Sequence, residues 1–206
     1  MEYTQSFLLD SIDILKKLPM EEIESVADVL KTIKNEGGRI FFAGSGGGAG
    51  HSSHAAADFR KLAGIESYSV TDNVSELSAR INDNSWDESY AGWLKSSNLN
   101  NRDCLFIFSV GGGDAESNIS NNLVMAIKLA LKVGAKVTGI VGRNGGFLRQ
   151  NCTASILIPT ASPHNITTQV EGFQALLWHL LVCHPKLDPG VPKWESTSEV
   201  SQEKFI

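Results

Sequence analysis

His54 and Asp58 are the two residues of this sequence whose types and spacing most directly suggest chemistry. They lie four positions apart in a stretch with helical character, and residues four apart stack on one face of a helix. An imidazole and a carboxylate held together can bind one metal ion, or act as a base and the group that orients it. The alternative is a partly exposed histidine beside a carboxylate that pairs with Arg60 or Lys61, because isolated pairs at this spacing are common.

Glu171 and His179 form a second candidate pair, eight residues apart in the last long apolar stretch. Eight helical residues span about 12 Å along the axis, which is far for one ion to be held by both from a single chain. Two structural explanations compete with a functional one. Thr168 and Glu171 have the spacing of a helix capping box. His179 lies beside leucines that indicate the core, where an imidazole needs a hydrogen-bond partner.

Two glycine-rich segments each follow an apolar, strand-like run and precede a helical one. The first is Gly44-Ser45-Gly46-Gly47-Gly48, and the second is Ser109-Val110-Gly111-Gly112-Gly113-Asp114. A strand, a glycine loop and a helix in this order expose backbone N–H groups at a helix N-terminus, where they bind anions. Two such loops in one small domain predict a phosphorylated ligand at the carboxyl edge of a parallel sheet.

The elements that position these residues alternate between helix and strand. We predict helices over residues 4–18, 20–36, 51–63, 74–81, 87–97, 117–133 and 169–183, and strands over residues 39–44, 67–70, 104–110, 136–141 and 155–158. The strands lack polar–apolar alternation, which is typical of parallel strands covered on both faces. The prediction is a three-layer α/β/α sandwich with a central, mainly parallel five-stranded sheet, preceded by N-terminal helices. Residues 1–185 form a single domain, with the amphipathic helices of 1–36 used in oligomerisation, and 186–206 form a C-terminal tail.

Composition excludes several other classes of protein. The net charge of −5 and the absence of a basic run argue against a nucleic-acid partner. There is no 18-residue apolar stretch and no charged-then-apolar leader, so we expect no membrane partner and a soluble, cytoplasmic protein. Cys104, Cys152 and Cys183 lack metal-site spacing and are expected to be reduced core residues.

These motifs and the order of elements resemble the sugar isomerase (SIS) domain family, and within it the phosphoheptose isomerases, over nearly the whole chain. That family has Gly-Asn-Gly-Gly-Ser after its first strand, then a histidine and, four residues later, a catalytic glutamate. Here His54 and Asp58 occupy these two positions. The family's last helix carries a glutamine and, eight residues on, a catalytic histidine, where this chain has Glu171 and His179. Its Asn-Asp pair matches residues 82–83.

The resemblance implies a flavodoxin-like SIS fold and aldose–ketose isomerisation of a phosphorylated sugar. The implied reaction is sedoheptulose 7-phosphate to D-glycero-D-manno-heptose 7-phosphate, for lipopolysaccharide precursors. Asp58 would remove the proton beside the carbonyl and His179 would exchange protons with the substrate oxygens. Zinc would be held by His54, Asp58, Glu171 and His179, at sites between the subunits of a homotetramer, which removes the 12 Å difficulty. The implied substrate-binding residues are Ser45, Gly46, Gly47, Gly48, Asn82, Asp83, Ser109, Gly111, Gly112, Gly113 and Thr168.

The chain departs from the family pattern at two places. The family's second loop, Ser-Thr-Ser-Gly-Asn-Ser, is here poor in hydroxyls and ends in Asp114, which either caps the next helix or repels a phosphate. Aspartate in place of glutamate at position 58 shortens the base by one methylene, and a misplacement of about 1 Å can cost on the order of 100-fold in rate. Two other functions therefore stay open: a non-catalytic sugar-phosphate sensor and a SIS-type protein-interaction module.

Overall fold

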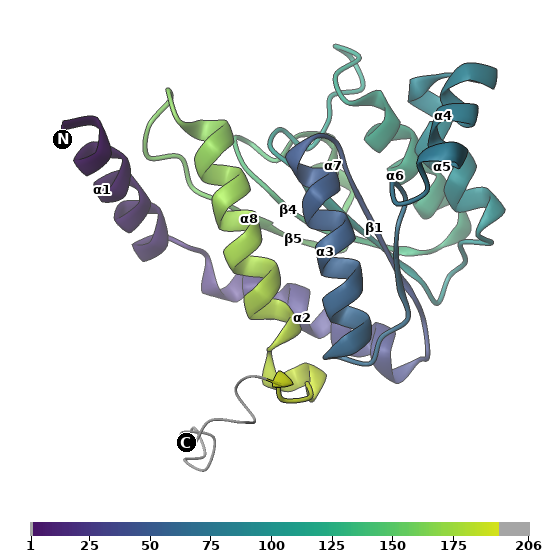
Figure 1. The fold of residues 1–206 in the computed structure, drawn as a ribbon, viewed down its shortest axis with the longest axis horizontal. Coiled ribbons are helices and arrows are strands. Elements are labelled where there is room, and N and C mark those ends of the chain that lie inside the picture. The colour runs from purple at the N-terminus through teal and green to yellow at the C-terminus, as the bar shows by residue number, and fades with distance from the viewer. Residues whose placement is uncertain (1, 194–206) are drawn as a thin grey trace.

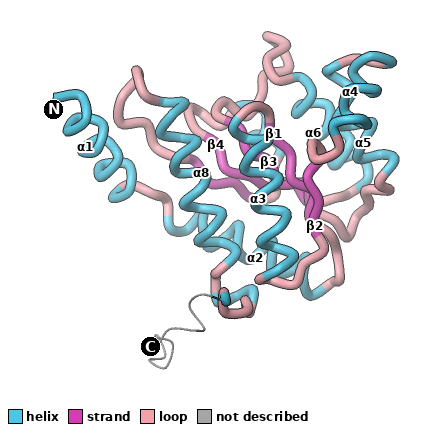
Figure 2. The backbone as a smooth tube through the Cα atoms, in the orientation of Figure 1, coloured by secondary structure: helices cyan, strands magenta, loops and turns pink. Residues whose placement is uncertain are grey.

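A five-stranded parallel sheet organises the computed structural model, which describes residues 2–193 (Figures 1 and 2). The strands lie in the order β2-β1-β3-β4-β5. They are β1 (Ile40–Gly44), β2 (Ser67–Ser69), β3 (Cys104–Ser109), β4 (Lys136–Val141) and β5 (Ala154–Leu157). The helices are α1 (Glu2–Lys16), α2 (Met20–Asn35), α3 (Gly47–Lys61), α4 (Val74–Asp83), α5 (Trp86–Ser96), α6 (Asn121–Val133), α7 (Gly146–Asn151) and α8 (Ile166–Val182), followed by a 3-10 turn, η1 (Pro185–Leu187).

Both faces of the sheet carry a hydrophobic core, because successive side chains of a strand point to opposite faces. On one face Phe42 and Phe106 pack with residues of α2, α3 and α8. On the other face Phe41, Leu105 and Ile107 pack with residues of α5, α6 and α7. Apolar residues therefore occupy consecutive positions of the strands. The predicted three-layer sandwich with a parallel five-stranded sheet is confirmed.

The positions of α3 and α6 create a crevice between β1 and β3. These strands are neighbours in the sheet, with Gly44 in register with Phe108. The chain leaves β1 into α3 on one face of the sheet and passes from β3 into α6 on the other face. Where connections diverge in this way, the carboxyl ends of the strands leave an opening in which ligands bind.

Three helices begin three or more residues away from their predicted starts. α3 begins at Gly47, so the glycine loop itself forms its first turn. α6 begins at Asn121, because residues 114–119 form a small hairpin instead of helix. α8 begins at Ile166 and no side chain caps it, so the predicted capping box at Thr168 is wrong. α7 was not predicted, because six residues are too few to show a helical period.

The chain that follows α8 packs onto α2. Leu187 is fully buried, and Lys186 forms ion pairs with Glu24 and Asp28. The predicted tail thus starts as a packed segment, while residues 194–206 lie outside the described residues. The expectation that the cysteines lie in the core fails for Cys183, whose side chain is exposed.

α1 stands away from the sheet at one end of the molecule, as Figure 1 shows. Ile14 is its one buried residue. Its exposed apolar side chains are Tyr3, Leu8, Leu9, Ile12 and Leu15. Within residues 2–193, no helix has the length and apolar character needed to cross a membrane.

Candidate functional site

A small pocket of about 180 Å³ lies at the crevice between the carboxyl ends of β1 and β3. It is lined by Ser45, Gly48, Phe108, Ser109, Val110, Gly111, Ser120, Leu123, Glu171 and Gln174. Ser120 was missed in the sequence analysis, which placed it inside a helix. In the structure it precedes α6 in the left-handed conformation, with φ of 51°. The run of turn-forming residues 117–121 was the available signal.

The first glycine loop folds tightly over both strands. Gly46 has φ of 59° and ψ of −122°, a conformation that favours glycine. A Cβ on Gly44 would lie 2.4 Å from the carbonyl carbon of Gly48, and a Cβ on Gly48 would lie 2.6 Å from the carbonyl oxygen of Phe108. The close approach leaves backbone rather than side chains to line this side of the pocket.

Glu171 reaches from α8 to the beginning of α3. Its carboxyl carbon lies 2.6 Å from the position that a Cβ on Gly47 would occupy. A helix N-terminus carries partial positive charge, so this carboxylate occupies a position suited to an anion. Beside it, burial lowers the pKa of His51, against an opposing effect of Glu171. The buried His51 Nε2 has no hydrogen-bond partner among the described residues.

Ser45 is oriented by two buried residues that the sequence analysis also missed. Asn122 of α6 donates a hydrogen bond of 3.1 Å from Nδ2 to Ser45 Oγ. The Tyr90 hydroxyl donates to the Gly44 carbonyl at 2.7 Å, and burial raises the pKa of this phenol. Tyr90 and Asn122 come from α5 and α6, on the face of the sheet opposite to α3. Their positions in the sequence therefore gave no sign that they contact the first glycine loop.

The glycines of the second loop pack against the loop that follows β4. A Cβ on Gly112 would lie 1.9 Å from the carbonyl oxygen of Gly145, and one on Gly146 would lie 2.4 Å from the carbonyl oxygen of Gly113. The Gly112 N–H donates to Ser109 Oγ at 3.0 Å. Gly111 lines the small pocket, whereas Gly112 lines neither this pocket nor the larger cavity beside it. The close packing of the two loops therefore explains why glycine stands at positions 112 and 113.

Asp114 does not cap a helix. Its Oδ1 accepts hydrogen bonds from the backbone N–H groups of Glu116 and Ser117, and these bonds lower the pKa of Asp114. The carboxylate therefore stabilises the hairpin of residues 114–119 in its ionised form.

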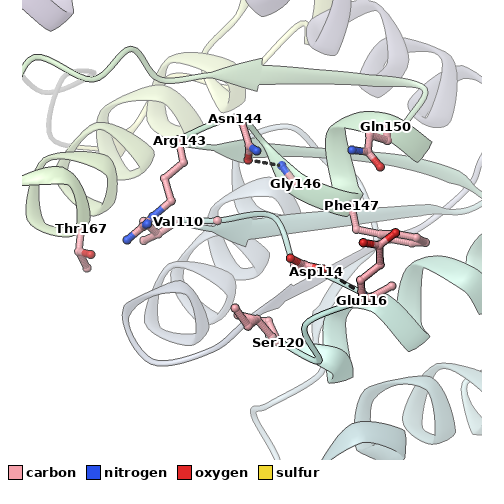
Figure 3. A pocket seen from close by; sticks show the side chains of 14 residues that line it. Val110, Asp114, Glu116, Ser120, Arg143, Asn144, Gly146, Phe147, Gln150 and Thr167 are labelled. Atoms are coloured by element: carbon pink, nitrogen blue, oxygen red, sulfur yellow. Dashed lines mark hydrogen bonds between the residues drawn. The ribbon is translucent and has the colours of Figure 1, made fainter. Parts of the chain in front are cut away.

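A larger cavity of about 740 Å³ lies between this hairpin and the loop after β4 (Figure 3). Val110, Gly111 and Ser120 line both cavities, so the two adjoin. Figure 3 shows Arg143 extending toward Val110 and Thr167, whereas Glu116 lies beside Phe147. The complete lining is Val110, Gly111, Gly113, Asp114, Ala115, Glu116, Ile119, Ser120, Arg143, Asn144, Gly146, Phe147, Gln150 and Thr167.

His54, Asp58 and His179 converge where α3 and α8 lie side by side. Each offers a ligand atom within 4.8 Å of the other two, and His54 Nε2 lies 3.6 Å from Asp58 Oδ2. His179 Nδ1 lies 2.7 Å from the carbonyl oxygen of Ala175. Since a carbonyl only accepts, Nδ1 carries the proton in the neutral ring and Nε2 keeps its lone pair. The side chain of His54 is 61% exposed, so the cluster is open to solvent on one side.

Other predicted site residues lie apart from this cluster. Glu171 is two helical turns away along α8 and is not one of the three converging residues. Asn82 and Asp83 end α4 and line neither cavity. Thr168 is exposed and donates to the carbonyl of Asn165, while its neighbour Thr167 lines the larger cavity.

Comparison with known proteins identifies the family. A family model for the SIS domain matches residues 3–142. The chain belongs to the SIS domain family. The SIS fold thus accounts for the parallel sheet and for the crevice between β1 and β3.

Three similar proteins illustrate the place of this SIS protein in the family. The lincomycin biosynthesis protein LmbN of Streptomyces lincolnensis is 30% identical over 187 residues, which cover 86% of this chain and 66% of LmbN. A phosphoheptose isomerase of Aliarcobacter butzleri is 27% identical over 79% of this chain and 82% of its own. The structure of phosphoheptose isomerase GmhA from Neisseria gonorrhoeae has a TM-score of 0.74 at 22% identity, covering 88% of this chain and 96% of that one. This last likeness supports the fold.

Proposed function

We propose that this protein is an aldose–ketose isomerase of phosphorylated sugars. The proposed reaction converts sedoheptulose 7-phosphate into D-glycero-D-manno-heptose 7-phosphate, for heptose and lipopolysaccharide synthesis. The observation that carries the proposal is the convergence of Asp58 and His179, from helices far apart in the sequence, with His54 in the same cluster. The similarity to phosphoheptose isomerases over about four-fifths of both chains supports the substrate class.

The distance between the pocket and the cluster suits a linear sugar phosphate. Glu171 and His179 lie eight residues apart on α8, so their side chains point within about 80° of each other at roughly 100° per residue. Glu171 lines the small pocket, and His179 lies about 12 Å further along the helix axis. A substrate with its phosphate near the glycine loops would place its first carbons near the cluster. The substrate-binding residues predicted from the sequence stay predictions, to which Ser120 and Gln174 are added.

Asp58 and His179 have separate roles in the proposed mechanism. The Asp58 carboxylate removes a proton from C1 of the ketose and returns it to C2, through an enediol. In the metal-free cluster, His179 moves a proton between the oxygens on C1 and C2, with Nε2 as the exchanging atom. An Nε2 that held zinc could not carry this proton, because Nδ1 is already protonated and the ring has no other lone pair. The hydrogen bond from Nδ1 to Ala175 holds the ring in the required tautomer.

The cluster has the ligand chemistry of a zinc site. Two imidazoles and one carboxylate, with ligand atoms within 4.8 Å of one another and one open side, match the donor sets of catalytic zinc. We propose that His54, Asp58 and His179 hold one zinc ion per subunit. Glu171, the fourth predicted ligand, would complete the site only if its carboxylate left Gly47. Bound zinc would polarise the substrate carbonyl as a Lewis acid.

A homotetramer is the proposed assembly, because α1 exposes a group of large apolar side chains, and such groups mark protein–protein interfaces. Leu176 and Leu180 of α8 are also exposed, near His179, so an interface there would complete the site from a neighbouring subunit. Sedimentation of the wild type and of Leu8→Asp tests this assembly. We also propose a cytoplasmic location, since Cys104 and Cys152 are free thiols.

The test is turnover of sedoheptulose 7-phosphate, with and without zinc. Asp58→Asn and His179→Gln should each abolish isomerisation without loss of folding. Asp13→Asn, which breaks an exposed pair with Lys17, is the matched control and should retain activity. Binding without turnover of any C5 to C7 ketose phosphate would favour a sensor, and neither binding nor turnover would favour an interaction module.

A further inference from the structure

The two adjoining cavities differ in charge. The small pocket contains the Glu171 carboxylate, and its lining includes no cationic side chain in the described part of the chain. The larger cavity contains Arg143, together with Asp114 and Glu116. Asp114 is bound by its own hairpin, and Glu116 lies beside Phe147 rather than beside Arg143. In the described part of the chain, Arg143 is therefore the one cationic side chain that lines either cavity.

The small pocket suits hydroxyl groups better than a phosphate. Gln174 is 1% exposed, and its Nε2 donates to the carbonyl of Ile140, but its Oε1 has no partner among residues 2–193. A buried acceptor without a donor is costly, so this atom favours a ligand that brings an O–H group. The Glu171 carboxylate also accepts hydrogen bonds without donating any, and it repels a phosphate dianion.

Arg143 is held at the junction of the cavities and has no internal partner. Its Cδ lies 3.9 Å from the position of a Cβ on Gly111, so its aliphatic stem lies over a residue that lines both cavities. The residue has φ of 52°, and the next side chain, Asn144, accepts from the Gly146 N–H, which fixes the turn. Across the described residues, the guanidinium makes no hydrogen bond or ion pair. A left-handed backbone at a non-glycine residue is strained, and strained residues of this kind cluster at functional sites.

We propose that Arg143 binds the phosphate of the sugar phosphate, at the junction of the two cavities, while the small pocket receives hydroxyls of its carbon chain. A planar guanidinium binds phosphate oxygens through two parallel hydrogen bonds. Thr167, in the first turn of α8, lines the larger cavity together with Arg143. This inference rests on the proposed function and assigns the phosphate to a residue outside both glycine loops.

The test compares Arg143→Gln and Arg143→Lys with the wild type in the zinc-supplemented full chain. Arg102→Gln is the matched control, because Arg102 is an exposed arginine on the loop before β3, at the opposite edge of the sheet. For Arg143→Gln, kcat/KM for sedoheptulose 7-phosphate should fall about 10- to 100-fold, the loss expected for a hydrogen bond to a charged group. Inhibition by inorganic phosphate should weaken by a similar factor, while binding of unphosphorylated sedoheptulose should stay unchanged. The kcat/KM and the phosphate inhibition of Arg143→Lys should lie between those of the wild type and Arg143→Gln. Arg102→Gln should keep the wild-type values of both.

The outcomes separate this inference from the proposed function. If the wild type isomerises the sugar phosphate but Arg143→Gln keeps both kcat/KM and phosphate inhibition, the assignment of Arg143 is wrong. If the wild type binds the sugar phosphate by calorimetry without turnover, and Arg143→Gln loses that binding, the assignment holds and the isomerase proposal fails. Equal loss of binding for phosphorylated and unphosphorylated sugar would show that Arg143 does not recognise phosphate. Far-UV circular dichroism checks that each variant folds.

Discussion

Substitution of Gly47 by alanine should keep the stability of this protein and lower its activity. Gly47 is the first residue of α3 and does not need a left-handed backbone. Replacing such a glycine by alanine reduces the entropy of the unfolded chain and adds roughly 0.4–1 kcal/mol of stability. The new Cβ would meet the Glu171 carboxyl carbon at 2.6 Å, whereas ordinary contact begins at 3.4 Å. A carboxylate at the end of a flexible side chain can retreat by nearly an ångström, so the fold should survive and Glu171 should move.

The displacement of Glu171 should lower the catalytic efficiency. A displacement of about 1 Å in a binding constellation can reduce the rate on the order of 100-fold. We therefore expect Gly47→Ala to melt at or slightly above the wild-type temperature, with kcat/KM for the sugar phosphate lowered at least about tenfold. Thermal melting and steady-state kinetics on the same preparation measure both quantities.

Gly50→Ala is the control for this experiment. Gly50 lies one turn further along α3, and a Cβ there meets no atom within 4 Å. This variant should gain about 1 kcal/mol, or roughly 2–4 °C in melting temperature, with unchanged kinetics. Equal activity of the two variants would refute the placement of Glu171 in the substrate path. A large loss of stability in Gly47→Ala would show that its carboxylate cannot retreat.

Three further predictions concern packing, pH and metal. Gly112→Ala places a Cβ 1.9 Å from the Gly145 carbonyl oxygen and should lower the free energy of unfolding in urea by well over 2 kcal/mol. Gly37→Ala is the control: its φ of 64° is strained for alanine but the space around it is open, so the loss should be about 1–2 kcal/mol. Burial raises the pKa of Glu22, but hydrogen bonds from its arginine partner on α7 and from a β5 backbone N–H outweigh this effect, so the pKa of Glu22 is lowered from its ordinary value of 4.5. The contribution of Glu22 to stability is therefore present above pH 4.5 and is lost as the pH falls through the folded pKa. Glu22→Gln should therefore unfold more easily at pH 7 and show a shallower loss of stability on acidification; an unchanged acid profile would contradict this. Zinc at 100 times its dissociation constant should stabilise the wild type by about 2.7 kcal/mol in a melting assay, and His54→Ala should lose this shift.

Several features of the fold follow from local sequence. The apolar runs of β1, β3 and β4 predicted a parallel sheet with two covered faces, because a strand buried on both sides has no polar positions. The stop of α2 at Gly37 and the left-handed cap of α6 at Gly134 also followed from residue type. The starts of α3, α6 and α8 did not, since they depend on hydrogen bonds made across loops.

For the site, the sequence alone supplied the pair His54 and Asp58, because the spacing of four residues on one helix already puts two side chains on one face. Spacing could not place His179 with them, since the separation of two helices in the chain says nothing about their contact in space; the sequence analysis grouped these residues only through the resemblance to the family. Only the tertiary structure shows that α3 and α8 pack side by side with His179, rather than Glu171, facing the pair. The hydrogen bond from Asn122 to Ser45 is likewise visible only in the tertiary structure, because the two residues come from different elements that meet at the carboxyl edge of the sheet. Local periodicity determines which residues share a face, and the packing of the faces determines which of them act together.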